Sequence, residues 1–398
     1  MRLLTSLVAA ATLAAFGACA DEQRPTPPPT PSSGSAPATA TASATATAAT
    51  AAPPSTAGAA TSAGAGSFVP KRIAVEAKAM GTHVLVASYT TTLLNEEALK
   101  PKLDRAIEEI RRLEALMTTW RDDSEVSRIN AAAGKEAIAV GPETFAVLEK
   151  SLWISKESGG VFDVTFEAMK GLWRFDNGGD DKIPDKAAVE TARKKIDYRK
   201  IELDAGKHTV FLKGAGMKMN LGGIAKGYAV DAAAKVLERE GVAAFFVQAG
   251  GDLYVRGRKP DGAFKVGVRD PRAAGCGPTT LGKECYFAMI EVEDHSFSTA
   301  GDYERSFVKA GKRYHHIIDP RTGFPATAAR SVTIWAKDAL TADAIDDAVF
   351  IMGPDKGLAL VESIDDCGAV IVDAKNKVWI SKRLKDKVWV SRQPTDGI

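Results

Sequence analysis

The sequence has few cysteines and no excess of charge of either sign. Four of its 398 residues are cysteines, and none of them shows the spacing of a zinc site. Lysine and arginine number 52 against 50 aspartates and glutamates, which leaves a net charge of +2. Without a basic excess, nucleic acid is disfavoured as a main partner. The chain also contains no Gly-x-Ser-x-Gly elbow and no Cys/His pairing, so nothing suggests a serine or cysteine hydrolase.

The apolar stretch near the N-terminus is too short to span a membrane. It runs from Leu3 to Phe16, follows the positive Arg2 and ends in Gly17-Ala18-Cys19. This pattern predicts a signal peptide over residues 1–19. Small residues directly before a cysteine resemble a bacterial lipobox, which predicts a lipid on Cys19 and anchoring on the periplasmic side of a bacterial membrane. The alternative is a plain secretory signal cut near the same place.

Large apolar residues are nearly absent from residues 20–67. This stretch consists almost wholly of Ala, Pro, Ser, Thr and Gly, and it cannot bury enough apolar surface to offset the entropy of ordering. We therefore predict a disordered tether over 20–67. Residues 68–398 are long enough to form a large core, as one domain or two fused lobes.

The cysteines other than Cys19 have separate predicted roles. Cys276 and Cys285 flank a loop of Gly, Pro and Thr and can close a local disulfide in an oxidising compartment. Cys367 stands at the entry to an apolar strand and is predicted to be a buried free thiol.

Hydrophobic periodicity predicts an α+β body with largely antiparallel strands and flanking helices. The predicted helices cover 96–117, 124–130, 142–157, 186–195, 224–240, 341–352 and 355–363. Strands are predicted at 72–89, broken at Met80-Gly81-Thr82, and Val161–Thr165 is also expected to be strand-like. Three consecutive antiparallel strands are predicted at 296–301, 303–309 and 313–319.

The stretch Asn220 to Asp231 contains a glycine-rich turn that opens a helix. Glycines let a backbone approach a ligand closely, and the free N–H groups of a first helical turn favour a phosphate. Lys226, in that turn, can add a charged donor. The spacing matches neither a Walker A loop nor a Rossmann fingerprint, so an ordinary turn before an amphipathic helix is the alternative.

Asp343 and Asp347 are four residues apart on one predicted helix, so they share a face. Like charges at that spacing repel, and a hard cation such as Mg²⁺ would relieve the repulsion. The alternative is an acid-rich helix start with solvated carboxylates.

Several single residues are candidates for chemistry or binding. His316 is predicted on a strand with Tyr314 and Ile318, at the lip of a turn, where it is either a catalyst or a satisfied core residue. Trp120, in a polar loop, can stack on a planar ring or cap the preceding helix. Asp163 and Asp252 can accept hydrogen bonds from a ligand or cap turns.

Taken together, these segments resemble the ApbE family, the FAD:protein FMN transferases. The motifs that carry the resemblance run in order over nearly the whole body: Met80-Gly81-Thr82, Trp120 with Ser124-Glu125 and Asn130, Gly160 to Asp163, Asn220 to Asp231, Ala249 to Asp252, Ser298 to Tyr303, His316 to Gly323, and Ala342 to Gly353. Each motif is weak alone, but the ordered set, with His-Ile-Ile-Asp-Pro-Arg-Thr-Gly intact, is highly specific.

The resemblance implies an ApbE-like fold with two fused lobes around a flavin cleft, and an exported, Mg²⁺-dependent enzyme. Such an enzyme takes FAD as substrate, breaks its pyrophosphate, moves FMN to a threonine hydroxyl in a flavinylation motif of an exported acceptor protein, and releases AMP. The turn with Gly223, together with Lys226, would then hold the pyrophosphate. Asp343, Asp347 and the backbone carbonyl of Ala225 would bind the metal.

The resemblance also implies roles for the remaining candidates. His316 would be the base that takes the proton of the threonine. Met80 and Trp120 would pack against a ring of FAD. Polar contacts to the ligand would come from three carboxylates, those of Asp163, Asp231 and Asp252.

Two positions depart from the family pattern. Position 347 is Asp where the family more often has Thr, which is expected to tighten cation binding while adding negative charge near a phosphate. Trp120 replaces a frequent Tyr and keeps the stacking surface without the hydroxyl. Two other functions share the same residues: an FAD pyrophosphatase in which water replaces the threonine, and a lipid-anchored flavin-binding module without turnover.

Overall fold

The computed structural model describes residues 68–175, 181–276 and 283–398. The predicted signal peptide (1–19) and tether (20–67) lie outside the described residues. The described residues form one compact unit. Within the described ranges, no helix combines the length and the apolar character needed to cross a membrane.

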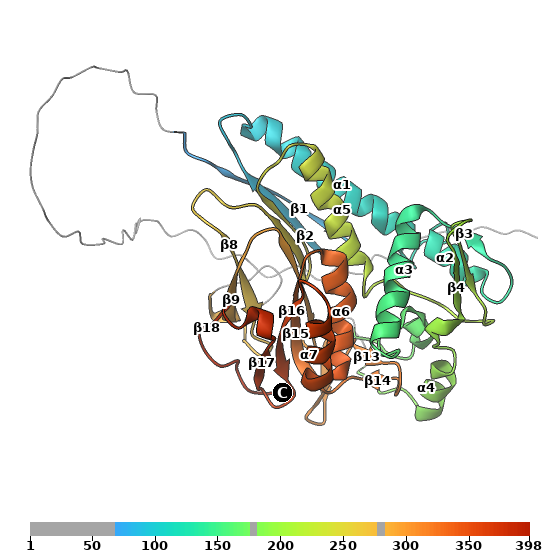
Figure 1. Cartoon of the computed structure of the whole chain (residues 1–398). Coiled ribbons are helices and arrows are strands. Elements are labelled where there is room, and N and C mark those ends of the chain that lie inside the picture. Colours follow the sequence, from blue (N-terminus) through green and yellow to red (C-terminus); the bar gives the residue numbers. More distant parts are fainter. Residues whose placement is uncertain (1–67, 176–180, 277–282) are drawn as a thin grey trace, which may run out of the picture. The chain divides into compact units, whose positions relative to one another are not determined.

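The centre of this unit is an eight-stranded sheet whose neighbouring strands are all antiparallel (Figure 1). The strand order is β1-β2-β6-β7-β10-β15-β16-β17. The bounds are β1 Arg72–Ala79, β2 Thr82–Tyr89, β6 Phe245–Ala249, β7 Asp252–Arg256, β10 His295–Gly301, β15 Ala329–Ala336, β16 Gly368–Asp373 and β17 Val378–Ile380. The predicted mixed, largely antiparallel α+β class is confirmed.

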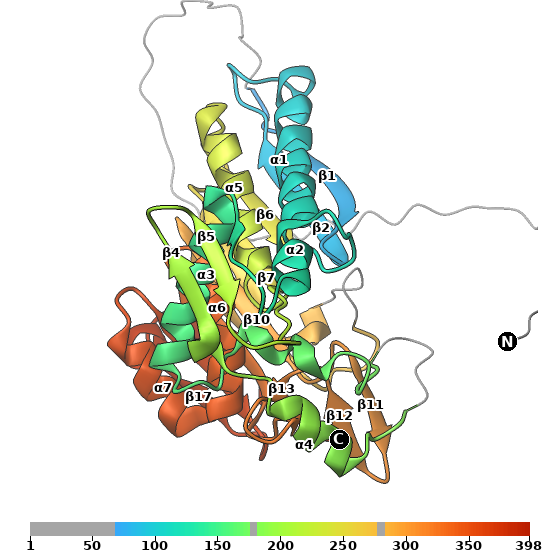
Figure 2. The ribbon, with the colours of Figure 1, turned by 90° about the vertical axis from the view of Figure 1, so that its right-hand side faces the viewer.

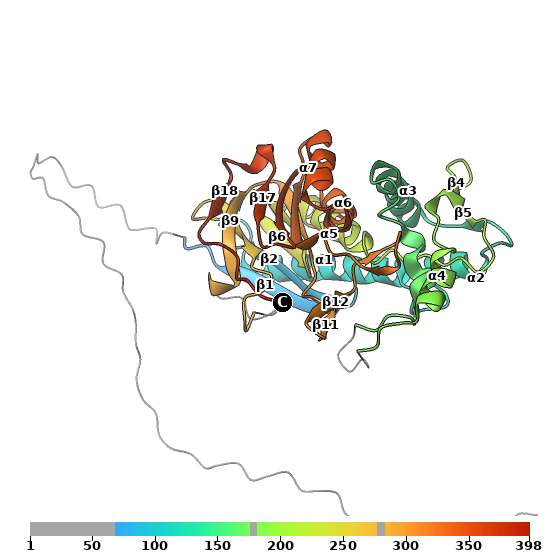
Figure 3. The same cartoon turned by 90° about the horizontal axis from the view of Figure 1, so that it is seen from below.

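Helices cover one face of this sheet, as the view from below shows (Figure 3). They are α1 Glu96–Met117, α5 Ala225–Arg239, α6 Ala339–Met352 and α7 Pro354–Ser363. The leucines and isoleucines that recur at helical spacing along α1 are buried, because this stripe faces β1, β2 and α5. The predicted bounds of α1 and α7 agree with the structure, whereas α6 begins two residues before the predicted Thr341 and is capped by Asp338.

A smaller sheet covers the opposite face of the central sheet. Its order is β18-β9-β8, with bounds β18 Val388–Val390, β9 Tyr286–Val292 and β8 Phe264–Arg269. Phe264 and Phe287 of the small sheet pack against Phe297 and Trp335 of the central one in a second hydrophobic core. Side chains of β10 therefore alternate between two cores: Phe297 points to the small sheet, while Ser298 points toward α6.

The chain between α1 and α5 builds a separate group of elements beside α6. It contains α2 Glu125–Ala131, β3 Ile138–Ala139, α3 Pro142–Glu157, the 3₁₀ helices η1 Val164–Met169 and η2 Tyr198–Lys200, α4 Lys186–Arg193, β4 Ile201–Asp204 and β5 Thr209–Leu212. Its strands pair in the order β3-β5-β4, and α3 packs against α6 (Figure 2).

One expected strand and one apolar run are held by polar side chains and lie in no sheet. Val161–Thr165 is not a strand, because the Asp163 carboxylate accepts hydrogen bonds from the backbone and hydroxyl of Thr165 and starts η1. The apolar run Met217–Leu221 is extended but lies in no sheet. The side-chain amide of Asn130 instead binds both backbone groups of Met219, at 2.7 and 2.9 Å.

The predicted set of three consecutive strands is also corrected. β11 Ser306–Lys309 and β12 Lys312–His315 form a hairpin, but β10 pairs with β7 and β15, not with β11. The third predicted strand is interrupted at His316 and Ile317, after which β13 Ile318–Asp319 pairs with β14 Phe324–Pro325. His316 thus lies at a bend, not on a strand.

The predictions for Cys276, Cys285 and Cys367 are confirmed. Cys276 and Cys285 form a disulfide that joins the loop after β8 to the 3₁₀ helix η3 Lys283–Cys285. Cys367 is buried and free.

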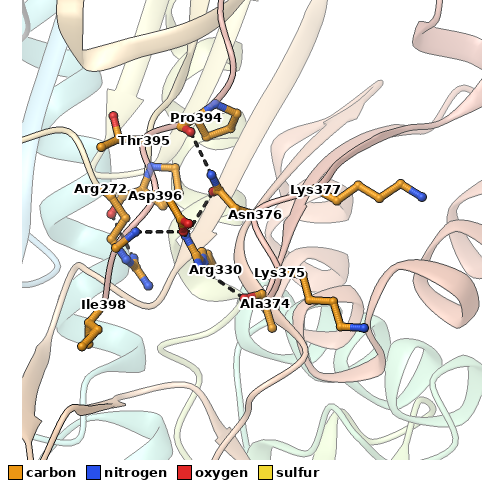
Figure 4. Close-up of polar contacts among 12 residues, drawn as sticks. Arg272, Arg330, Ala374, Lys375, Asn376, Lys377, Pro394, Thr395, Asp396 and Ile398 are labelled. Carbon is orange, nitrogen blue, oxygen red and sulfur yellow. Dashed lines mark hydrogen bonds and ion pairs between the residues drawn. The ribbon is translucent and has the colours of Figure 1, made fainter.

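The C-terminal segment, after β18 and the 3₁₀ helix η4 Lys382–Leu384, runs back across the molecule. Arg330 of β15 pairs with Asp396 at 2.9 Å, and the amide of Asn376 donates to the Pro394 carbonyl at 2.8 Å (Figure 4). Further along, Arg313 of β12 donates to the backbone oxygen of Ile398 at 2.7 Å. This segment therefore connects the central sheet to the β11–β12 hairpin.

Gly227 allows α5 and α6 to cross closely. A Cβ atom at this position would lie 2.2 Å from the carbonyl oxygen of Ala339 and 2.7 Å from the Cβ of Asp343. We expect Gly227→Ala to lower the free energy of unfolding by roughly 2–3 kcal/mol, because backbone on a facing helix cannot move aside cheaply. Gly206→Ala is the matched control, since its Cβ would meet only the Asp204 carboxylate at 3.4 Å. Equal denaturant midpoints for the two variants would contradict this account.

Candidate active site

The crossing of α5 and α6 brings a lysine between two buried carboxylates. Lys226 Nζ lies 2.8 Å from Asp252 Oδ2 and 3.1 Å from Asp343 Oδ1. The second oxygen of Asp343 accepts the backbone N–H of Gly227 at 2.8 Å. Asp252 comes from the start of β7, so the ammonium connects three elements that are far apart in the sequence. The structure thus brings together three predicted site residues, Lys226, Asp252 and Asp343.

The charges of this group depend on one another. Burial alone would lower the pKa of Lys226, but the carboxylates of Asp252 and Asp343 raise it well above its ordinary value. Burial, followed by repulsion from Asp252, raises the pKa of Asp343 to about 7, and the Lys226 charge opposes that rise. The ammonium is therefore held as a permanent cation facing two acids.

Asp346 is a further site residue, which the sequence analysis did not single out. It lies on the same face of α6 as Asp343, and carboxylate oxygens of Asp252, Asp343 and Asp346 lie within 4.8 Å of one another. Three aspartates at i, i+3 and i+4 on one helix face were visible in the sequence. The spacing did not reveal the fourth carboxylate, that of Asp252, because Asp252 lies on the strand β7.

Ser298 connects Asp346 to Asp252. Its Oγ lies 2.6 Å from an oxygen of each carboxylate. A hydroxyl has one proton to donate, so it can donate to only one of them, and the other carboxyl must carry a proton to complete the second bond. Burial and repulsion from Asp347 and Asp343 raise the pKa of Asp346, which makes Asp346 the protonated member.

Asp347 faces the glycine-rich turn. A Cβ on Gly223 would lie 3.2 Å from Asp347 Oδ2, so the turn and α6 are in close approach. Burial raises the pKa of Asp347 to about 6, and the charges of Lys226 and Arg305 oppose this rise. Within the described part of the chain its carboxylate has no hydrogen-bond or ion-pair partner. It is half-buried and able to take a ligand.

His316 also has an unused polar atom. Its backbone N–H donates to the Arg305 carbonyl at 3.1 Å, but its buried Nδ1 has no hydrogen-bond partner among the described residues. Burial, together with the positive charge of Arg305, lowers the pKa of His316 to about 3. The imidazole is therefore neutral near pH 7 and can accept a proton. Its neighbour His315 is a core residue, bonded to the Ala326 carbonyl at 2.8 Å.

Two of the predicted ligand-binding acids have structural partners instead. Asp231 accepts the backbone N–H groups of Ala339 and Leu340, at 2.8 and 2.9 Å, and so caps the start of α6. Asp163 starts η1 and also accepts the N–H of Tyr198. Backbone and hydroxyl donors thus contact both oxygens of each carboxylate, so both residues have a role in the scaffold. Their expected contacts to the ligand stay a prediction.

The two predicted ring-packing residues lie on turns. Met80 occupies the tight β1–β2 turn with a positive φ of 51°, half-buried against the main core. Trp120 is 86% exposed, and Lys170 lies over its ring at 4.9 Å. An indole exposed to this extent has a free face, which agrees with a stacking role rather than with capping of α1.

Comparison with known proteins assigns the fold and these motifs to one family. The model of the ApbE family matches residues 80–371. An FAD:protein FMN transferase of Treponema pallidum is 35% identical over 290 residues, which cover 69% of this chain and 77% of that protein. The chain belongs to the ApbE family.

Solved structures of ApbE proteins agree with this assignment. An ApbE protein of Thermotoga maritima superposes with a TM-score of 0.69 at 30% identity, over 82% of this chain and 100% of that one. The flavin transferase ApbE of Vibrio cholerae superposes with a TM-score of 0.68 at 25% identity, over 80% and 100% of the two chains.

A divalent cation fits this ApbE site best beside Asp347. In the trio of Asp252, Asp343 and Asp346, the Lys226 ammonium already supplies a positive charge, and Ser298 occupies two of the oxygens. Asp347 instead has a carboxylate without a partner, next to the start of α5, where the predicted ligand Ala225 is the first helical residue. Oxygen ligands of this kind suit Mg²⁺.

We expect Mg²⁺ to raise the melting temperature more at pH 8 than at pH 5.5. The pKa of Asp343 is raised to about 7 and that of Asp347 to about 6, so both are largely protonated at pH 5.5 and must lose protons to bind a cation. The apparent affinity for Mg²⁺ should fall at least about tenfold between these pH values, since one pKa unit is a tenfold change in protonation. Calorimetry with and without EDTA measures both effects.

Variants separate this cation effect from general stabilisation. Asp343→Asn should abolish the Mg²⁺-dependent shift at both pH values, while Asp204→Asn, at the exposed end of β4 outside the site, should keep it. An equal Mg²⁺ shift at pH 5.5 and pH 8 would contradict the assignment.

Proposed function

We propose that this protein transfers FMN from FAD to a threonine hydroxyl of an acceptor protein, with Mg²⁺ as cofactor. The observation that carries the proposal is the close approach of the Gly223 turn to the Asp347 carboxylate, which has no partner among the described residues. His316 adds a buried Nδ1 that has no hydrogen-bond partner among the same residues. The relatives named FAD:protein FMN transferase support the reaction class. The threonine and the magnesium are our own assignments.

The chemistry is a phosphoryl-type transfer in which one bond replaces another. The threonine oxygen bonds to the phosphorus of the FMN half, and the bond from that phosphorus to the bridging oxygen of the pyrophosphate breaks. AMP leaves with the bridging oxygen, and the threonine proton passes to the imidazole of His316. When bound, Mg²⁺ would lower the negative charge on the phosphate under attack.

The residues of this chain position the reactants. The glycine turn at Gly223 lets the backbone approach the pyrophosphate, and Trp120 offers its exposed face to a ring of FAD. Asp343 and Asp347, with the Ala225 carbonyl, would hold the metal. The single positive charge of Lys226 offsets part of the negative charge of Asp252 and Asp343, which weakens the repulsion between the four-carboxylate region and an anionic substrate.

The test supplies the full chain with FAD, Mg²⁺ and a threonine-bearing flavinylation-motif peptide, read by intact mass. We expect the peptide to gain one FMN while AMP appears, and EDTA to stop both. Asp343→Ala should abolish transfer. His316→Ala should reduce transfer by about 100-fold or more, as removal of a general base does, with a much smaller loss of FAD binding.

Other outcomes point to other functions. Free FMN and AMP beside an unmodified peptide would indicate an FAD pyrophosphatase. Tightly held, unchanged FAD would indicate a flavin-binding module, and equal losses of transfer and FAD binding in His316→Ala would remove its assignment as the base.

We further propose that the enzyme works outside the cytoplasm, held to a bacterial membrane by a lipid on Cys19. The motivation is the signal-like N-terminus, the predicted tether and a disulfide that suits an oxidising compartment. Cys19→Ser should move the protein from the membrane fraction to the soluble periplasmic fraction after osmotic shock. A wild-type chain found in the cytoplasmic fraction would contradict the proposal.

A further inference from the structure

Arg305 is an exposed cation at the base of the β11–β12 hairpin. It directly precedes β11, and its carbonyl accepts the N–H of His316, one step beyond the last hairpin pair, Ser306 with His315. The side chain of Arg305 has no ion pair or hydrogen bond to any residue that the structure describes. Three other arginines do have partners: Arg269 pairs with Glu304, Arg272 with Asp302 and Arg321 with Asp319.

The charge of Arg305 affects the pKa of two groups in the proposed site. It contributes to the low pKa of His316, and it opposes the burial that raises the pKa of Asp347. The backbone hydrogen bond between the two residues holds Arg305 and His316 side by side. His316 Nδ1 and the Asp347 carboxylate also have no hydrogen-bond partner within the described residues. The Arg305 guanidinium and the Nδ1 of His316 are thus two polar groups, on hydrogen-bonded residues, that are free for a ligand.

The negative charges of the site outnumber its positive charges, so an anionic ligand needs a further cation such as Arg305. Lys226 is matched by Asp252 and Asp343, and Asp347 adds a further negative charge. A pyrophosphate diester brings one negative charge on each phosphate into this acidic surrounding. Lys226 is held by the two acids and cannot offer its full charge to the ligand, whereas Arg305 can. A guanidinium also presents paired N–H donors that match phosphate oxygens.

We propose that Arg305 binds the phosphate on the FMN side of FAD, the one that the acceptor hydroxyl attacks. This inference rests on the proposed function. The base and the attacked phosphate must lie on either side of the incoming hydroxyl, and Arg305 is joined through its backbone to His316. The AMP-side phosphate is the leaving group and does not need to contact the base.

The test compares four ligands on the full chain at constant Mg²⁺: FAD, FMN, riboflavin and AMP, with affinities from equilibrium dialysis. In Arg305→Gln we expect FAD and FMN to bind at least about tenfold more weakly, because a hydrogen bond to a charged group is lost. Riboflavin, which has no phosphate, and AMP should keep their wild-type affinity. Arg305→Lys keeps the charge without the paired donors and should give an intermediate loss.

Lys312→Gln is the matched control, because it removes one positive charge from the same hairpin at its tip, where Nζ lies over the Tyr314 ring. It should leave all four affinities unchanged. The proposal is overturned if Arg305→Gln weakens riboflavin as much as FMN, weakens AMP instead of FMN, or changes no affinity. These affinities do not depend on turnover, so loss of the FMN-specific effect and failure of transfer in the mass assay are separate results.

Discussion

The ion pairs of Lys226 are the interaction on which the site depends. An ammonium in contact with two buried carboxylates holds the first turn of α5 to the start of β7 and to the face of α6. Removing one partner of such a group leaves uncompensated buried charge, which is far more destabilising than the loss of an exposed pair. The same contacts place Asp347 beside the glycine turn. The scaffold and the binding geometry are therefore set by one partly buried cation.

The Lys226 ammonium reaches both carboxylates only because the backbones of α5 and α6 come close together. Gly227 removes the side chain that would meet the Ala339 carbonyl, and the Gly223 turn approaches Asp347 in the same way. Asp231 then fixes the start of α6 by accepting two of its free N–H groups. Two glycines and one capping acid thus orient a helix that presents three aspartates on one face.

The sequence predicted the elements well where one signal dominates. Periodic leucines and isoleucines marked α1, and the paired cysteines marked a local disulfide. The sequence was less informative at positions where a polar side chain takes the place of a backbone hydrogen-bond partner. Asp163 and Asp231 have the composition of ligand-binding acids, yet both cap helices, and Asn130 takes the place of a neighbouring strand for Met219. Asp346 and Arg305 escaped notice because their neighbours come from distant segments, which spacing along one chain does not reveal.

The cap that Asp231 places on α6 also bears on the order of assembly. Protein groups hold the start of the helix, so the orientation of its aspartates does not rest on the cation that we propose. Small metal-dependent domains differ, because their apo form is unfolded. A chain exported in an unfolded state would thus be able to fold first and acquire its metal afterwards from the surrounding medium.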